Sequence, residues 1–410
     1  MRNIRYFCTV KSFNIVFRAS FIAVICLFII GITPAKSAEE SMDSVEVGLL
    51  TCSPHQLIYG YFGHTAIRFH DLRSGDDWTF NYGIFNMHIP LFIPRFVLGL
   101  TDYEMGVMPF DVFCTEYSHF GSSVTEQMLN LTGDEKQSLY NALVENYRPE
   151  NRKYRYNYFY DNCTTRARDM IERCIAGKVK YNEDKVNKTT YRNLVHDCTI
   201  MHPWTSFGID LALGAKSDME IDRAKQEFLP ARLMQDFSSA VIIDANGKTR
   251  SLITGTRMDI KPGVQVVRGN FPLTPNEVSV IILLVTVLIS GYEFYKKRQM
   301  WIYDGILMLI DGVAGLLITF LLFSVHPTTT INFIFLVLNP LPLVFLPRMI
   351  KKSLQGKKDK FFKWAILPII LFYLVLVFGI QQYTTAMIIL ASCLLIRCIS
   401  RSILKIETDK

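Results

Sequence analysis

Apolar positions are concentrated in the last third of the chain. After residue 276, five apolar segments follow one another, at about 276–294, 302–325, 331–347, 364–380 and 384–400. Runs of this composition are typical of helices that cross a bilayer, although Pro340 and Pro342 interrupt the third. We therefore predict an α-helical membrane domain of about five transmembrane helices over residues 274–410.

Charges at the connections between these segments predict the orientation of the membrane domain. Basic residues at 296–298 follow the first segment, and a lysine-rich stretch at 351–363 follows the third. The second and fourth connections, at 326–330 and 381–383, contain no lysine or arginine. Because basic connections remain in the cytoplasm, we expect the domain before residue 274 to lie on the outer side.

The first 38 residues show the pattern of a secretory signal peptide. Four basic residues precede an apolar stretch at 21–32, and Ala35-Lys36-Ser37-Ala38 has the small residues of a cleavage site. The apolar stretch is too short to favour a spanning helix, and an uncleaved anchor stays open as the alternative. Both forms place the following domain outside, in agreement with the charge pattern.

The middle of the chain has short segments of two periodicities, which predict an α+β domain. Strands are expected at 45–51, 64–70 and 78–83, helices at 132–146 and 162–177, a mainly helical stretch at 191–236 and short strands at 238–270. We divide the chain into a signal peptide at 1–38, a first domain at 39–180, a helical extension with a short-strand juxtamembrane region at 181–273, and the membrane domain at 274–410. The apolar stretch 85–100 either dips into the bilayer or belongs to the core of the first domain.

The distribution of charged residues and of cysteines argues against a nucleic-acid partner and against a zinc site. The net charge of +7 does not indicate a nucleic-acid partner, because the lysines and arginines gather beside the apolar segments. The exported part contains Cys52, Cys114, Cys163, Cys174 and Cys198, an odd number that leaves one free unless it pairs between chains. No Cys and His cluster has the spacing of a zinc site, so we expect neither a metal nor another cofactor.

Cys163 has the sequence environment of a nucleophile. Asp161 and Asn162 are residues that cap helices, so Cys163 falls in the first turn of a helix whose apolar face contains Ala167 and Met170. At that place the helix dipole stabilises a thiolate, and the free amides can receive an oxyanion. The alternative is a buried structural cysteine.

His64 is the histidine best placed to act as the base for this cysteine. It opens a strand in which His64, Ala66 and Arg68 face one way, and the small Ala66 would let a helix approach closely. A histidine on a strand opposite a cysteine at a helix start is the layout of papain-like enzymes, here with the order of the two residues permuted. Asn81 or Tyr82 on the next strand would orient the imidazole, and Asn81 is favoured because its amide oxygen can accept a hydrogen bond.

Two arginines near these residues are candidate contacts for a lipid phosphate. Arg68 follows His64 on the strand, and Arg166 follows Cys163 on the helix. Ion pairs with nearby Asp or Glu residues are an equally open interpretation for both.

Several motifs resemble one family. Gly63-His64-Thr65-Ala66-Ile67-Arg68, Phe80-Asn81-Tyr82-Gly83, the segment 156–169 and Phe228-Leu229-Pro230 resemble the Lnb family of lipoprotein N-acyltransferases of Bacteroidota, as does Asn339-Pro340-Leu341 in the membrane part. More distantly, the order of His64 and Cys163 is similar to the lecithin–retinol acyltransferase type of permuted papain-like fold. The resemblance covers essentially the whole mature chain.

The resemblance implies a fold, a reaction and a location. The fold would be an α+β permuted papain-like periplasmic domain followed by the helical membrane domain, in the inner membrane. Cys163 would take an acyl chain from a membrane phospholipid as a thioester, with His64 as base, and the N-terminal amine of a diacylated lipoprotein would receive it. The bilayer, its phospholipids and diacylglyceryl lipoproteins are then the partners, and no cofactor is needed.

Polar residues within the membrane part suggest more than anchoring. His326 and Asn332 lie toward the outer end and could hold a lipid head group or the lipoprotein amine, or simply cap interrupted helices. Asp311 lies deeper in the second segment, whereas Asp304 lies near its cytoplasmic end, where water is the expected surrounding. A membrane-tethered cysteine peptidase or peptidoglycan amidase, and a non-catalytic assembly protein, remain the alternative functions.

Overall fold

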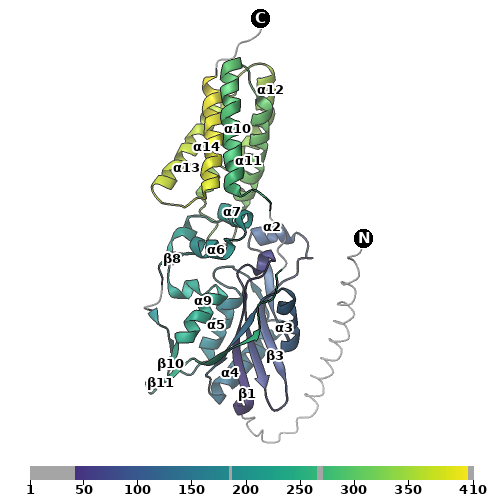
Figure 1. Ribbon diagram of the computed structural model, residues 1–410, viewed down its shortest axis with the longest axis vertical. Helices are drawn as coiled ribbons and strands as arrows, with labels where there is room; N and C mark the ends of the chain where they lie inside the picture. Colours follow the sequence, from purple (N-terminus) through teal and green to yellow (C-terminus); the bar gives the residue numbers. More distant parts are fainter. Residues whose placement is uncertain (1–41, 184–186, 266–270, 405–410) are drawn as a thin grey trace, which may run out of the picture. The chain divides into compact units, whose positions relative to one another are not determined.

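The computed structural model describes residues 42–183, 187–265 and 271–404. The predicted signal peptide, at 1–38, lies outside the described residues. From Ser44 onward the described residues belong to one compact unit, in which a sheet domain is followed by a helical extension and a bundle of membrane helices (Figure 1).

A seven-stranded antiparallel sheet forms the centre of the first domain (Figure 1). Its strands lie in the order β12 (Ile253–Ile260), β5 (Val124–Leu129), β1 (Val45–Cys52), β2 (His64–Asp71), β3 (Asp77–Ile84), β4 (Asp102–Pro109) and β6 (Lys153–Arg155). The three strands predicted from alternation are therefore present as β1, β2 and β3. The sheet also takes its edge strand β12 from the stretch 181–273, so the first domain and the extension are interleaved along the chain.

Four helices pack on the sheet. They are α3 (Phe110–His119), α4 (Gly133–Tyr147), α5 (Cys163–Cys174) and α9 (Pro230–Ser239). Helix α4 begins with a capping box, because Thr132 and Glu135 cap each other's backbone amides. Helix α3 and the strands on either side of it, β4 and β5, were not predicted. In β5 the usual alternation is hidden because two polar residues, Glu126 and Gln127, are both buried.

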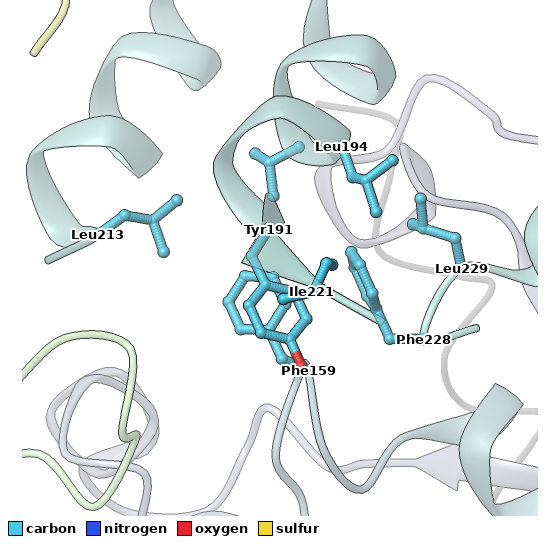
Figure 2. Packing of buried hydrophobic residues seen from close by; sticks show 8 residues of the cluster. Phe159, Tyr191, Leu194, Leu213, Ile221, Phe228 and Leu229 are labelled. Carbon is cyan, nitrogen blue, oxygen red and sulfur yellow. The ribbon is translucent and has the colours of Figure 1, made fainter. Parts of the chain in front are cut away.

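The extension consists of short elements joined to the segment that precedes α5. Its strands are β7 (Lys178–Lys180), β8 (Thr189–Thr190), β9 (Glu220–Ile221), β10 (Val241–Ile243) and β11 (Thr249–Ser251), and its helices are α6 (Tyr191–Thr199), α7 (Pro203–Ala212) and α8 (Arg223–Gln226). Figure 2 shows the core of this region, in which Phe159, Tyr191 and Phe228 pack together. Burial of these rings fixes the residues just before Cys163 against the extension.

The membrane domain confirms the predicted helical bundle. It contains α10 (Pro275–Lys296), α11 (Trp301–Leu322), η5 (Phe333–Leu336), α12 (Leu341–Leu354), α13 (Phe361–Val377) and α14 (Thr385–Ile403). Among the described residues, four segments are long and apolar enough to cross a membrane, and the fifth apolar helix, Phe361–Val377, is shorter. The third span is broken between η5 and α12, as Pro340 predicts. This span packs closely on α11 because Gly315 of α11 has no side chain. A Cβ at that position would collide with the backbone of Asn339.

The surroundings of Asp304 in the helical bundle differ from those expected from the sequence. This carboxylate is buried instead of lying in water, because α14 brings Arg397 to 2.8 Å and Arg401 to 3.1 Å from its two oxygens. Such a group is tolerated inside the bundle only when it is paired. Asp311 lines an apolar cavity of about 150 Å³ among the membrane helices, and one of its oxygens has no hydrogen-bond partner among the described residues. All the residues that line this cavity belong to the membrane domain, so it is separate from Cys163.

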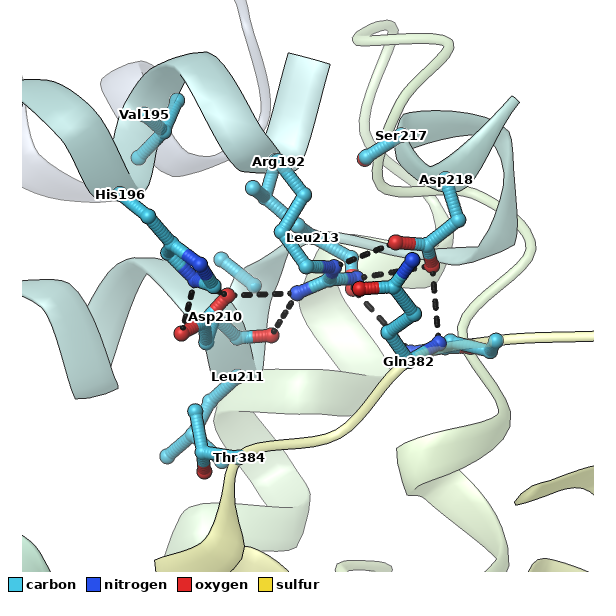
Figure 3. A network of polar contacts seen from close by, with 12 residues as sticks. Arg192, Val195, His196, Asp210, Leu211, Leu213, Ser217, Asp218, Gln382 and Thr384 are labelled. Carbon is cyan, nitrogen blue, oxygen red and sulfur yellow. Dashed lines mark hydrogen bonds and ion pairs between the residues drawn. The ribbon is translucent and has the colours of Figure 1, made fainter. Parts of the chain in front are cut away.

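A buried arginine joins the extension to the membrane domain. The Arg192 guanidinium donates to Asp210 and to Asp218, each over 2.7 Å, and the backbone N–H of Gln382, before α14, donates to Asp218 (Figure 3). His196 completes the network with a 2.7 Å contact to Asp210. Both carboxylates thus depend on Arg192 for their charge balance.

Replacing Arg192 by methionine is therefore expected to destabilise the protein by about 3–5 kcal/mol, since two buried carboxylates lose the guanidinium that pairs with both. Thermal unfolding of the purified protein in detergent measures the effect. The matched control is Lys188→Ala, because Lys188 is solvent-exposed and only loosely paired with Glu220 at 3.7 Å, so little change is expected. Equal unfolding temperatures for the two variants would show that the network does not hold the parts together.

Candidate active site

Three predicted residues meet at one end of the sheet. His64 is the first residue of β2, Asn81 lies on the neighbouring strand β3, and Cys163 is the first residue of α5. Ala66 is directly opposite Asn81, so Asn81 is on the same face of the sheet as His64. The amide oxygen of Asn81 is 2.5 Å from Nε2 of His64.

The register also decides between Asn81 and Tyr82. Tyr82 points to the opposite face of the sheet, where its hydroxyl donates to Asn146 on α4. Of the two residues that the sequence left open as partners of His64, only Asn81 is in contact with the ring. Because its oxygen accepts, Nε2 carries a proton and Nδ1 is free to face the sulfur.

The start of α5 is fixed by Asn162, as the sequence predicted. The Asn162 side chain accepts from the amides of Thr164 and Thr165, both over 2.9 Å, and donates to the carbonyl oxygens of Tyr158 and Phe228. One side chain therefore caps the helix and connects it to the extension. Because Asn162 occupies two amides of the first turn, the amide of Cys163 itself is the one left there for an oxyanion.

The helix that carries Cys163 approaches β2 from the side opposite to the one expected. Thr164 of α5 contacts Thr65, with the two hydroxyl oxygens 3.2 Å apart, so α5 lies on the Thr65 face of the strand. The small Ala66 instead makes room for Phe113 of α3, on the face of His64. His64 and Cys163 still meet, because each is the first residue of its element and they face each other at the end of the strand.

The Cys163 thiol and the His64 imidazole form a hydrogen-bonded pair. Burial raises the pKa of Cys163, but the charge of His64, its hydrogen bond and the amide of Thr65 outweigh burial and lower this pKa to about 7. For His64, burial lowers the pKa, while the Cys163 charge and the bonds to Cys163 and Asn81 outweigh it and raise the pKa. Both shifts favour a thiolate beside an imidazolium near neutral pH.

Three other thiols of the described residues have the opposite electrostatic surroundings. Burial raises the pKa of Cys114 and of Cys198, each to about 11, and raises the pKa of Cys52 well above its ordinary value. A thiol with a raised pKa is a poor nucleophile at neutral pH. Within the described part of the chain the cysteines are unpaired and no group of His, Cys, Asp or Glu could hold a metal ion. Cys163 is thus distinguished by its environment and not only by its position.

Two further residues, Tyr117 and Gly83, lie beside the site and were missed from the sequence. The Tyr117 ring, on the unpredicted helix α3, stacks on His64 with centroids 6.0 Å apart, and its hydroxyl hydrogen-bonds Cys52. Gly83 has φ +92, and a Cβ there would lie 3.8 Å from Cβ of Cys163. Gly83 belongs to the Phe80–Gly83 motif, which was the one local signal that could have pointed to it.

Arg68 and Arg166 are both held by ion pairs, which was the alternative interpretation. Arg68 is buried against Phe110 and pairs with Asp77 and Glu126, on the face of the sheet turned away from α5. Arg166 pairs with Asp161 through two bonds of 2.6 and 2.7 Å. These ion pairs account for both side chains without a lipid phosphate.

His326 and Asn332 also have structural partners. Asn332 is buried, where it caps η5 and donates to the carbonyl oxygen of Leu211 over 2.8 Å. Capping, the alternative stated for Asn332, thus accounts for its side chain. His326 is only partly buried, and its ring hydrogen-bonds the backbone oxygen of Phe96 in the first domain. Neither residue lies among the contacts of Cys163.

Comparisons with known proteins match both parts of the chain. Residues 35–197 match the family model of the Lnb N-terminal periplasmic domain, and residues 267–409 match that of the Lnb transmembrane domain. The chain belongs to the Lnb family. Cys163, His64 and Asn81 fall within the part that matches the Lnb periplasmic domain. No curated protein and no solved structure matches the chain.

Membership of the Lnb family confirms the resemblance noted from the motifs. The fold class is confirmed as well, because an α+β domain built on a sheet precedes a helical region with several apolar spans. The chain is therefore a membrane protein with a periplasmic domain of the Lnb type.

Proposed function

We propose that this protein is an N-acyltransferase that moves an acyl chain from a membrane phospholipid to the N-terminal amine of diacylated lipoproteins. The observation that carries the proposal is the pair of His64 and Cys163 with its lowered thiol pKa, held in an Lnb periplasmic domain attached to membrane helices. A nucleophile that is ionised near neutral pH can attack an ester.

The first half of the reaction forms a thioester. His64 holds the thiol proton at Nδ1, and the thiolate of Cys163 attacks the carbonyl carbon of a phospholipid ester. The oxyanion is stabilised at the start of α5, where the Cys163 amide points outward from the helix. The C–O bond then breaks, and His64 returns the proton to the leaving oxygen, which produces a lysophospholipid.

The second half transfers the acyl chain to the amine. The α-amine of a diacylglyceryl-cysteine attacks the thioester carbonyl, while His64 accepts a proton from the nitrogen. The C–S bond breaks, an amide is formed and the Cys163 thiolate is regenerated beside the imidazolium. Asn81 keeps the ring in one orientation through both halves, since its oxygen holds the Nε2 proton.

We place the protein in the inner membrane with Cys163 on the periplasmic side. Two observations support this orientation. The uncharged connections after α11 and α13 contact the extension, through Thr328 to Gly214 and through Gln382 to Asp218. The lysine-rich connection at 351–363 belongs to the opposite ends of the helices, where basic residues remain in the cytoplasm.

Mass spectrometry of lipoprotein N-termini from a deletion strain tests the proposal. We expect diacylated lipoproteins with a free amine in the deletion strain, and acylated N-termini when the wild-type gene is restored. Labelled phospholipid should also give a hydroxylamine-sensitive adduct on Cys163. Unchanged N-acylation in the deletion strain, with no paralogue present, would refute the transferase and favour a peptidase or amidase.

A further inference from the structure

An apolar surface is exposed on the first domain around the short helix α2 (Phe92–Val97). Leu91 and Ile93 are each 73% exposed, Met87 is 59% exposed and Phe96 is 46% exposed. We call these four residues the α2 surface. They lie in the stretch 85–100, which therefore does not belong to the core of the domain. Large apolar side chains gathered in one short segment mark a contact with a partner or a membrane.

The backbone at Leu91 adds a second sign of a functional surface. Leu91 has φ +57, a left-handed conformation that a leucine rarely adopts, and its side chain is nevertheless turned outward. Strained backbone conformations of this kind persist where the surrounding structure holds them in place, and they cluster at functional sites.

The other side of α2 is attached to the membrane domain. Val97 packs on the apolar cluster of the membrane helices that contains Ile318 and Leu321. The amide of Val325, just after α11, donates to the carbonyl oxygen of Leu98 over 3.1 Å. Gly99 is so close to Val325 that an added Cβ would lie 2.7 Å from its side chain. The α2 surface therefore lies at the level where α11 leaves the membrane.

A row of aromatic rings runs from α2 toward Cys163. Phe92 stacks on Phe85 with centroids 5.9 Å apart, Phe85 stacks on Tyr103 at 4.9 Å, and Tyr103 stacks on Tyr156 at 4.1 Å. Burial and, after it, the charge of Cys163 raise the pKa of Tyr156, so the far end of the row lies near the site. Phe85 also follows Gly83, the residue next to Cβ of Cys163, by two positions.

We propose that the α2 surface inserts into the outer leaflet of the bilayer and that the aromatic row receives a phospholipid acyl chain and leads its ester to Cys163. The inference rests on the proposed function and adds the entry site for the acyl donor. Continuity with the membrane domain favours lipid as the occupant, because a surface fixed at the end of α11 faces head groups and acyl chains. Arg95, exposed on the same helix, would lie at the level of the phosphates.

Acylation of Cys163 in vesicles tests the entry site. Purified full-length protein is reconstituted in vesicles of phosphatidylethanolamine and phosphatidylglycerol, and the rate of thioester formation on Cys163 is measured. We expect Ile93→Glu to slow this step by about tenfold or more, since a charge opposes insertion of the surface. Alkylation of Cys163 by iodoacetamide, which needs no lipid, should proceed at the wild-type rate.

Leu72→Glu is the matched control. Leu72 is 56% exposed, in the turn between β2 and β3, so it carries the same change of charge away from α2. Wild-type acylation in both variants would overturn the entry site while leaving the transferase intact. Absence of a thioester on Cys163 in the wild-type protein would instead refute the transferase.

Photo-crosslinking tests whether the α2 surface contacts acyl chains, and it does not depend on catalytic turnover. Phosphatidylethanolamine with a diazirine at the end of one acyl chain is used with the Cys163→Ala variant, which cannot consume it. Adducts on residues 85–98 support insertion of the α2 surface. Adducts confined to the helices between residues 275 and 403 would overturn insertion of the α2 surface. The same result is expected if a second protein, and not lipid, covers this surface.

Discussion

Replacing Cys163 by serine is expected to abolish acyl transfer, by about 10⁴-fold or more, while the protein still accumulates in the membrane. The hydroxyl has the shape of the thiol, but its pKa is far too high for His64 to ionise it as it ionises a thiol whose pKa is about 7. The fold should tolerate the change, because the nearest hydrogen-bonding side chain on α5 is Thr164, at 3.8 Å from the sulfur.

The measurement is N-acylation of a diacylated lipopeptide by membranes that contain each variant, with the protein quantified by immunoblot. Cys174→Ser is the matched control, because Cys174 lies on the same helix and its inward face but outside the contacts of His64. We expect this control to keep its activity. Comparable activity for the Cys163 variant would show that another group is the nucleophile.

Removing the imidazole is expected to have the second largest effect. His64→Ala should lower the rate of acyl transfer by about 10²–10⁴-fold, the usual contribution of a positioned acid or base. It should also raise the pKa of Cys163, because the charge and hydrogen bond of His64 are lost while burial, which raises the pKa, remains.

The pH dependence of alkylation by iodoacetamide separates these effects. In the wild-type protein the rate at Cys163 should reach half of its maximum near pH 7, because half of the thiol is then ionised, and should fall as the pH is lowered. In His64→Ala the midpoint should move upward into the range of an ordinary thiol or above it. His70→Ala, on the same strand, is the control and should keep the wild-type midpoint. An unchanged midpoint in His64→Ala would exclude the ion pair.

Local patterns in the sequence determined the membrane domain and the positions of Cys163 and His64 within their elements. Hydropathy gives the spans directly, because each helix must satisfy its own backbone and expose apolar side chains to lipid. Cys163 at a helix start follows from Asn162 as a cap, and His64 at a strand start follows from the alternation after it. Each of these features depends on residues within a few positions, so no knowledge of distant contacts was needed.

The partners of these residues depended on the tertiary structure. The choice of Asn81 over Tyr82 requires the register of β2 with β3. The ion pair of Arg68 requires Glu126, which lies on β5, a strand that its buried polar residues hid from prediction. Asp304 would be in water if α14 did not bring Arg397 beside it.

The surroundings of Cys163 also depended on the tertiary structure. The sequence placed a cysteine at the start of a helix, and only the fold brought His64 and Thr65 to its thiol and Gly83 beside its Cβ. The physical reason is that the electrostatic state of a buried group is set by neighbours from other elements, and chain folding, not sequence spacing, selects those neighbours.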